Sequence, residues 1–221
     1  MKYSENLYVY PWENPMENNC NSYLIDGEVV TLIDPGHHHL FPQLETEMKK
    51  DGFSPQDVGL VLITHPHPDH CEAVQDFLDY DTKIAVHKEA DAFLDRYGEQ
   101  FYQMMGLSMP PWRVDILLDE GELLVGEHSF DIIYTPGHAP GSICIYWREQ
   151  KALFTGDVVF YQSVGRVDLP GGNGLQLKES IEKIASLDVE LLLPGHGPLV
   201  KGRGSVKENF YVIMSNVFSM I

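Results

Sequence analysis

Residues 60–70 read LVLITHPHPDH, in which four apolar residues precede three histidines and an aspartate. In an extended segment, residues i and i+2 point to the same side, so His65 and His67 can bind one ion together. Asp69 and His70 come where the chain turns into the next helix, and they can face a second ion. The two intervening prolines restrict φ and lower the entropic cost of holding these ligands in place. The segment therefore predicts a metal site at the end of a buried strand.

The same local pattern occurs four more times along the chain. A short apolar run, rich in β-branched residues, ends in a turn built from Gly, Pro or Thr and then in Asp or His. Such runs are typical of buried strands, and strand ends deliver residues into shared sites in layered α/β folds. The four further segments are VVTLIDPGH (29–37), FDIIYTPGH (130–138), KALFTGD (151–157) and VELLLPGH (189–196).

Three of these segments add candidate ligands to the first cluster. Each ends an apolar run through a glycine-containing turn, at His138, Asp157 and His196. Together with residues 65–70 they make a set of five histidines and two aspartates. A single zinc ion needs three or four protein ligands, whereas this set suits two ions about 3.5–4 Å apart with one bridging carboxylate.

The composition is that of an ordinary globular protein. The chain has 221 residues, 43% hydrophobic and 22% charged, which predicts one domain spanning 1–221. No apolar run approaches the ~18 residues of a membrane span, and the N-terminus has no apolar signal region. Three cysteines are few and odd in number, which favours a reduced, cytoplasmic protein without a membrane partner.

The net charge excludes one class of partner. Asp and Glu number 33 against 15 Lys and Arg, which gives −18 at pH 7. Such a surface repels phosphate backbones, so we expect no nucleic-acid partner and a small-molecule substrate instead.

The remaining periodicity predicts an α/β sandwich with mixed sheets and outer helices. The Asp26-Gly27 step is a hairpin signal, and the early strands are expected to pair antiparallel. Apolar residues at helical spacing predict the helices. The expected strands are 7–10, 22–25 and 28–33, and the expected helices are 41–52, 71–80 and 175–187.

Two segments stand apart from this pattern. Residues 88–115 are rich in aromatic residues, Met and Pro. They are expected either to form a helical pair packed on the sheet or to form a lid over a substrate pocket. The lid would use Phe101, Tyr102, Met105, Met109 and Trp112. The C-terminal segment 206–221 has an apolar stripe that predicts a helix, used for core packing or for contact with a second copy of the chain.

The motifs THPHPDH, TPGH, TGD and LLPGHGP are similar, in the same order, to those of the metallo-β-lactamase superfamily. The resemblance covers nearly the whole chain and implies an αββα sandwich, with two mixed sheets between outer helices. It also implies a ligand assignment: His65, His67 and His138 for the first ion, Asp69, His70 and His196 for the second, and Asp157 as the bridge. Asp69 is in addition the candidate catalytic residue, because it could accept and pass on a proton.

Differences between this sequence and individual branches of the superfamily reduce the number of activities that we expect. Asp157 stands where the best-known β-lactamases carry cysteine, and His67 replaces a glutamate of flavo-diiron proteins. The segment GRVDLPGGNGLQL (165–177) resembles short glyoxalase II-like hydrolases, also called hydroxyacylglutathione hydrolase-like, and persulfide dioxygenases. The chain lacks the long basic C-terminal extension that larger glyoxalase II enzymes use for glutathione.

Four residues outside the ligand set are candidates for supporting roles. Asp34 is expected to orient a ligand histidine, and His37 is the histidine of the 37–39 triplet expected to touch substrate. Arg166 and Asp168 are expected to form a salt bridge that braces their loop or contacts substrate.

The resulting hypothesis is a dinuclear hydrolase of a small thioester or ester. Two divalent ions, two aspartates and a bridging hydroxide leave the centre with about one positive charge, which favours an anionic transition state. The ligands suit Zn²⁺ best, and Fe²⁺ or Mn²⁺ are alternatives. Four other functions remain open: a persulfide dioxygenase with one non-haem iron on His65, His138 and Asp157, a lactonase, an RNA-processing nuclease and a non-catalytic metal-binding module.

Overall fold

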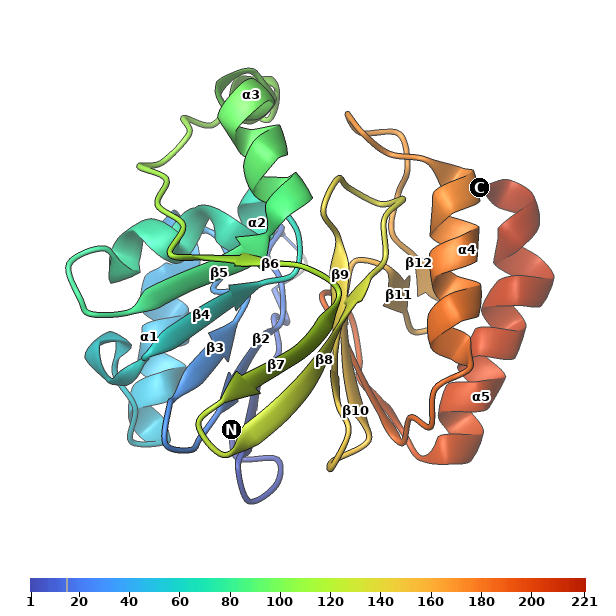
Figure 1. The fold of residues 1–221 in the computed structure, drawn as a ribbon, viewed down its shortest axis with the longest axis horizontal. Coiled ribbons are helices and arrows are strands. Elements are labelled where there is room, and N and C mark those ends of the chain that lie inside the picture. The colour runs from blue at the N-terminus through green and yellow to red at the C-terminus, as the bar shows by residue number, and fades with distance from the viewer. Residues whose placement is uncertain (15) are drawn as a thin grey trace.

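Two mixed six-stranded sheets lie face to face with helices on their outer faces (Figure 1). The computed structural model describes residues 1–14 and 16–221. The first sheet contains, in order, β1 (Leu7–Tyr10), β2 (Ser22–Ile25), β3 (Thr31–Ile33), β4 (Leu60–Ile63), β5 (Lys83–His87) and β6 (Ile116–Leu118). The second contains, in order, β14 (Val200–Lys201), β13 (Leu191–Pro194), β10 (Ala152–Gly156), β9 (Ile143–Trp147), β8 (His128–Tyr134) and β7 (Gly121–Val125).

The direction of the strands brings their ends to one edge. In the first sheet β1, β2 and β3 pair antiparallel, whereas β3, β4, β5 and β6 run parallel. In the second sheet β10 and β13 run parallel and the other pairs are antiparallel. Parallel neighbours end at the same edge of a sheet, so the loops after β3 and β4, and those after β10 and β13, emerge together.

The helices form the two outer layers. Helix α1 (Phe41–Lys50) and the short α2 (Pro68–Cys71) lie on the side of the first sheet. Helices α4 (Gly174–Ala185) and α5 (Arg203–Val212) cover the second sheet. Leu177, Ile181 and Ile184 of α4 are fully buried, and each such side chain contributes about 2 kcal/mol of hydrophobic free energy. The order helix, sheet, sheet, helix confirms the predicted αββα class.

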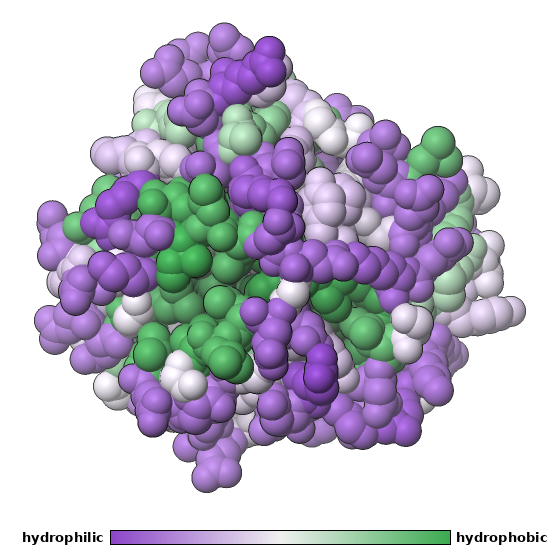
Figure 2. All heavy atoms as spheres, in the orientation of Figure 1, coloured by the Kyte–Doolittle hydropathy of each residue, from purple (hydrophilic) through white to green (hydrophobic). Residues whose placement is uncertain are grey.

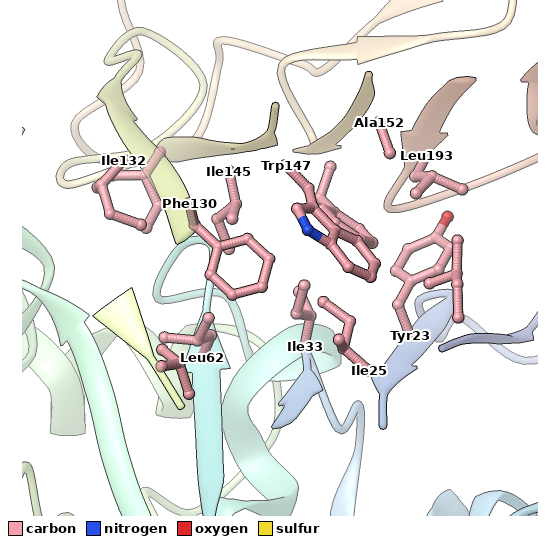
Figure 3. Close-up of a cluster of buried hydrophobic side chains, with 14 of the residues drawn as sticks. Tyr23, Ile25, Ile33, Leu62, Phe130, Ile132, Ile145, Trp147, Ala152 and Leu193 are labelled. Carbon is pink, nitrogen blue, oxygen red and sulfur yellow. The ribbon is translucent and has the colours of Figure 1, made fainter. Parts of the chain in front are cut away.

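The core between the sheets holds aromatic and branched residues from both sides (Figure 3). Tyr23, Ile25 and Leu62 reach it from the first sheet, and Phe130 and Trp147 from the second. Because the side chains packed in this layer are apolar, the loops at the sheet edge rest on a close-packed base.

Residues 72–77 differ from the predicted α-helix over 71–80. They form a 3₁₀ helix (Glu72–Phe77). Ala73 N–H donates to Gly36 O, and the Glu72 carboxylate accepts from the backbone of His38. Contacts with the loop after β3 therefore replace part of the regular helical bonding.

The segment 88–115 contains one helix, not a pair. Helix α3 (Lys88–Met104) is followed by irregular chain up to β6. Phe101 and Tyr102 are buried residues of α3 itself, and Met109 and Trp112 are partly buried against them. Two of the five expected lid residues are therefore core, and the lid function itself stays a prediction.

The apolar stripe of the C-terminal segment packs inside the protein. Val206, Phe210 and Ile213 are buried against the second sheet and α4. A homo-oligomer formed through this helix stays a prediction, and it would have to use the outer face, where Tyr211 and Met220 are exposed.

The largest hydrophobic area on the face shown in Figure 2 lies around β6 and β7. Ile116, Leu117 and Leu124 are exposed there on the edge strands of the two sheets. Among residues 1–14 and 16–221, no helix has the length and apolar character needed to cross a membrane.

Candidate metal centre

The seven predicted ligands come together at the shared edge of the two sheets. All but one are buried, and the His196 side chain keeps 27% of its surface exposed. Each is placed by a turn that directly follows a strand, or by α2. His65 follows β4, His67 precedes α2, Asp69 and His70 lie on α2, His138 lies in the β8–β9 loop, Asp157 follows β10 and His196 follows β13.

His65, His67 and His138 form one half of the centre, the first trio. His138 Nε2 lies 2.9 Å from His67 Nδ1 and 3.3 Å from His65 Nε2. Two nitrogens bound to one tetrahedral zinc ion at about 2.1 Å each are about 3.4 Å apart. The three ring nitrogens therefore have the mutual spacing of ligands to a single ion.

His70, His196 and Asp69 form the other half, the second trio. His70 Nε2 lies 3.2 Å from His196 Nε2, which lies 3.3 Å from Asp69 Oδ2. This trio again offers one donor atom per residue within reach of a single ion.

Asp157 lies between the two halves. Its Oδ1 is 3.2 Å from His70 Nε2, and its Oδ2 is 3.4 Å from His196 Nε2 and 3.6 Å from His138 Nε2. Both carboxylate oxygens therefore lie close to a nitrogen of the second trio, and Oδ2 also lies close to a nitrogen of the first trio.

The chemistry of the donors fits bound cations. Asp157 Oδ1 is buried without a hydrogen bond, although His70 Nε2 is close, and a buried carboxylate oxygen needs a partner. Burial lowers the pKa of His65 and of His138, and it lowers the pKa of His67 to about 3. These rings are neutral at pH 7, which is the form that binds a metal.

The second trio lies in a strongly negative environment. Burial by itself would lower the pKa of His196, but the charge of Asp157 outweighs it and raises that pKa to about 9. Burial would raise the pKa of Asp69, but the hydrogen bond from His196 and the charge of His70 hold it below its usual range. Ionised carboxylates around these rings stabilise positive charge in this half of the centre.

Asp34 supports the second trio through a hydrogen bond with His70. Its Oδ2 accepts from His70 Nδ1–H at 2.8 Å and from the Thr64 hydroxyl at 2.6 Å, and its Oδ1 accepts from Thr64 N–H at 2.8 Å. A carboxylate on Nδ1 fixes the tautomer that leaves His70 Nε2 free to bind an ion. The contact of Asp34 with His70 is compatible with the predicted orienting role, which stays a prediction.

The loop 165–173 supports the first trio through its backbone. His138 Nδ1–H donates to Arg166 O at 2.7 Å. The Arg166 side chain points into solvent and forms a two-pronged salt bridge with Asp168, with both N–O distances at 2.7 Å. The pair exists as predicted, and it braces the loop whose carbonyl orients a ligand.

Only glycine fits immediately before His196. A Cβ atom at Gly195 would lie 2.4 Å from Asp157 Oδ1 and 2.6 Å from His70 Cε1. The glycine in the PGH motif therefore lets the β13 turn approach the ligands of β10 and α2.

Two residues lie beside the centre without a ligand role in it. His37 Nδ1 pairs with Glu72 Oε2 at 2.6 Å, so its predicted contact with substrate stays a prediction. Cys71 is fully buried, and its Sγ lies 3.3 Å from the Tyr102 hydroxyl.

Asparagines of the segment before β2 were missed by the sequence analysis. Asn18 Nδ2–H donates to Asp69 Oδ2 at 2.7 Å. Asn21 Nδ2–H donates to Pro194 O at 3.0 Å and to Gly197 O at 2.9 Å, which holds the loop of His196. The cluster NNCN (18–21) was the available signal, but nothing local indicates partners more than 50 positions away.

A hydrophobic groove lies beside the first trio, and Phe101 connects the two. It encloses about 670 Å³ between α3 and the loops that follow His138 and Val167. The Phe101 ring stacks on the His67 ring, with centroids 5.4 Å apart and planes inclined by 28°. The apolar lining of the groove consists mainly of Phe93, Tyr97, Phe101, Met104, Pro140 and Pro170.

A polar hollow opens from the second trio. It encloses about 360 Å³ between His196 and residues 12–14 and 16–19. Glu13, Glu17 and Asn18 contribute to its wall. The centre thus lies between an apolar groove and an acidic, polar hollow.

Comparisons with known proteins agree with this geometry. A metallo-hydrolase of Methanocaldococcus jannaschii, described as probable, is 36% identical over 188 residues, covering 82% of this chain and 89% of that protein. The hydroxyacylglutathione hydrolase GloC of Haemophilus influenzae is 32% identical, covering 87% and 91%. A crystal structure of a protein in a di-iron-bound form superposes with a TM-score of 0.75 at 32% identity, covering 91% and 98%.

The family model of the metallo-β-lactamase superfamily matches residues 16–196, a span that includes all seven predicted ligands and every strand of the two sheets except β1 and β14. The chain therefore belongs to the metallo-β-lactamase superfamily, whose members include metal-dependent hydrolases such as the relatives named above.

Proposed function

We propose that this protein is a dinuclear metal-dependent hydrolase of a small thioester or ester. The observation that carries the proposal is the position of Asp157, whose two oxygens lie within 3.6 Å of nitrogens from both ligand trios. A carboxylate shared in this way is the usual bridge between two ions. The di-iron-bound neighbour supports a two-ion centre, and GloC supports thioester chemistry.

The bound ions would supply a water pKa near ~7 and a Lewis acid for the substrate carbonyl. The residues of this chain supply orientation and proton handling. Asp34 and Arg166 O fix the ring directions of His70 and His138. Asn18 holds Asp69 by Oδ2, and Asp69 Oδ1 makes no hydrogen bond within the described part of the chain. In this proposal Asp69 would accept a proton at Oδ1 and release it to the leaving group.

The groove and the hollow suggest where the two parts of a substrate would bind. The aromatic and aliphatic groove along α3 would hold an apolar acyl arm next to His67. The hollow at His196 would hold the leaving group, and Glu13 and Glu17 would repel carboxylates there. An acyl thioester with a neutral or cationic thiol arm fits this division better than a glutathione thioester, which carries two carboxylates.

Metal content tests the central proposal. Protein purified without chelators or a histidine tag should contain two ions of zinc, manganese or iron at the centre, measured by elemental mass spectrometry. Dialysis against a chelator should abolish thioester hydrolysis, and the added ions should restore it. A single iron that zinc does not replace, together with oxygen uptake on a persulfide, would instead support the dioxygenase alternative.

The groove can be tested at its exposed end. Met104 lines it and is 55% exposed, so Met104→Glu should fold normally. We expect kcat/KM for a hexanoyl thioester to fall about 10-fold, because the new carboxylate faces the acyl chain, while an acetyl thioester changes less than about twofold. Tyr211→Glu on α5, 70% exposed, is the control and should change neither substrate. Equal losses for both substrates in Met104→Glu would contradict an acyl-binding role.

A further inference from the structure

A second cluster of metal-binding side chains lies outside the seven-ligand centre. It joins the turn after β3 to the 3₁₀ helix after α2. His37 and His39 flank the start of the 3₁₀ helix His38–Leu40, and Glu72 begins the helix Glu72–Phe77. One donor atom from each of His37, His39 and Glu72 lies within 4.8 Å of the other two.

Most of the possible ligand atoms of this cluster make no hydrogen bond within the described part of the chain. His37 Nδ1 meets Glu72 Oε2 at 2.6 Å, and that oxygen also accepts from His38 N–H at 3.2 Å. Within the described residues, no hydrogen bond engages His37 Nε2, Glu72 Oε1 or either nitrogen of His39. An ion bound by both His37 and Glu72 would replace the hydrogen bond between them.

Two of the three side chains are held in a nearly dry position. His37 is 8% exposed and Glu72 is 7% exposed, whereas His39 is exposed. His37 N–H donates to Asn19 Oδ1, and Gly36 bonds through its backbone to both His70 and Ala73. The cluster therefore has two ligands on a fixed frame and a third that can close over an ion from solvent.

His38 provides an internal contrast. Its Nδ1 pairs with both oxygens of Asp76, at 2.8 and 3.0 Å, and its side chain is 52% exposed. It belongs to the same histidine triplet but is turned to a different partner. A metal held by the cluster would thus depend on His39 and not on His38.

We propose that His37, His39 and Glu72 form a third metal site, separate from the two-ion centre, for a transition metal such as Zn²⁺. Two imidazoles and one carboxylate suit Zn²⁺ and related ions, with water at the remaining position. Because one ligand is exposed and only three are provided, the ion binds more weakly here than at the seven-ligand centre. The site does not depend on the proposed hydrolase function, since none of its ligands belongs to that centre.

The test is Zn²⁺ titration of the full-length holoprotein, followed by isothermal calorimetry and by zinc analysis after equilibrium dialysis. We expect one weaker ion beyond those already bound. His39→Ala should lower the zinc content by one ion per chain, or weaken that step at least about 10-fold. His38→Ala should leave the step unchanged, and hydrolase activity should be unaffected in both variants.

The comparison between variants separates this site from the central one. Asp157→Ala should reduce binding at the centre and keep the step that depends on His39. An absent weaker step in the wild type would overturn the proposal. Equal losses in His38→Ala and His39→Ala would also overturn it, because they would indicate only an unspecific histidine tract.

Discussion

Asp157→Ala is expected to leave the centre unable to hold two ions and to lower kcat/KM by about 1,000-fold or more, which corresponds to about 4 kcal/mol of transition-state stabilisation. The carboxylate is within 3.6 Å of nitrogens from both trios, so its removal affects both halves at once. Loss of one terminal ligand would weaken only one half.

The measurement combines metal content with steady-state kinetics on a thioester. Asp188→Ala is a matched control, because it removes a carboxylate from exposed salt bridges with Lys151 and Arg203, at the end of β13 opposite to His196. An exposed pair contributes about 0–1 kcal/mol, so this variant should keep both ions and its activity. If Asp157→Ala still bound two ions and hydrolysed substrate at the wild-type rate, the dinuclear model would be wrong.

Asp34→Ala is expected to lower the free energy of unfolding of the metal-free protein by about 3–5 kcal/mol. Three buried donors lose their acceptor at once: Thr64 N–H, the Thr64 hydroxyl and His70 Nδ1–H. Asp34 also has a φ of 52°, in the left-handed region that aspartate tolerates better than alanine. Urea unfolding of the metal-free variant measures this loss separately from any effect of bound ions.

Asp34→Asn separates folding from ligand orientation. It keeps the shape and tolerates the same φ, so most of the stability should return. The amide cannot replace both oxygens of the carboxylate, and metal affinity should fall about 10- to 100-fold in competition with a chelator. Wild-type metal affinity in Asp34→Asn would show that the carboxylate does not orient His70.

Local patterns were sufficient for much of the fold. Alternating or continuous apolar runs predicted β4, β8, β10 and β13, and amphipathic spacing predicted α1 and α4. Segment ends were less predictable. The strand expected over 28–33 begins only at Thr31, because Gly59 and Leu60 N–H both bond to Val30 O just before the parallel register starts.

The contacts that tertiary structure decides join residues far apart in the chain. Residues 72–77 became a 3₁₀ helix through Gly36, and the aromatic residues after 88 divided between core and groove through their packing against His67 and Cys71. Side-chain periodicity gives no information on such pairings, because it describes one element at a time.

The amino-acid sequence by itself determined the seven candidate ligands and the αββα class, since the ligands follow four apolar runs, each of which ends in a short turn. Only the tertiary structure decided how those ligands are held. Asn18 on Asp69 and Arg166 O on His138 are hydrogen bonds across 51 and 28 positions. Ligand type is a local property of the chain, whereas ligand orientation depends on which backbone and side-chain groups the two packed sheets bring to the same edge.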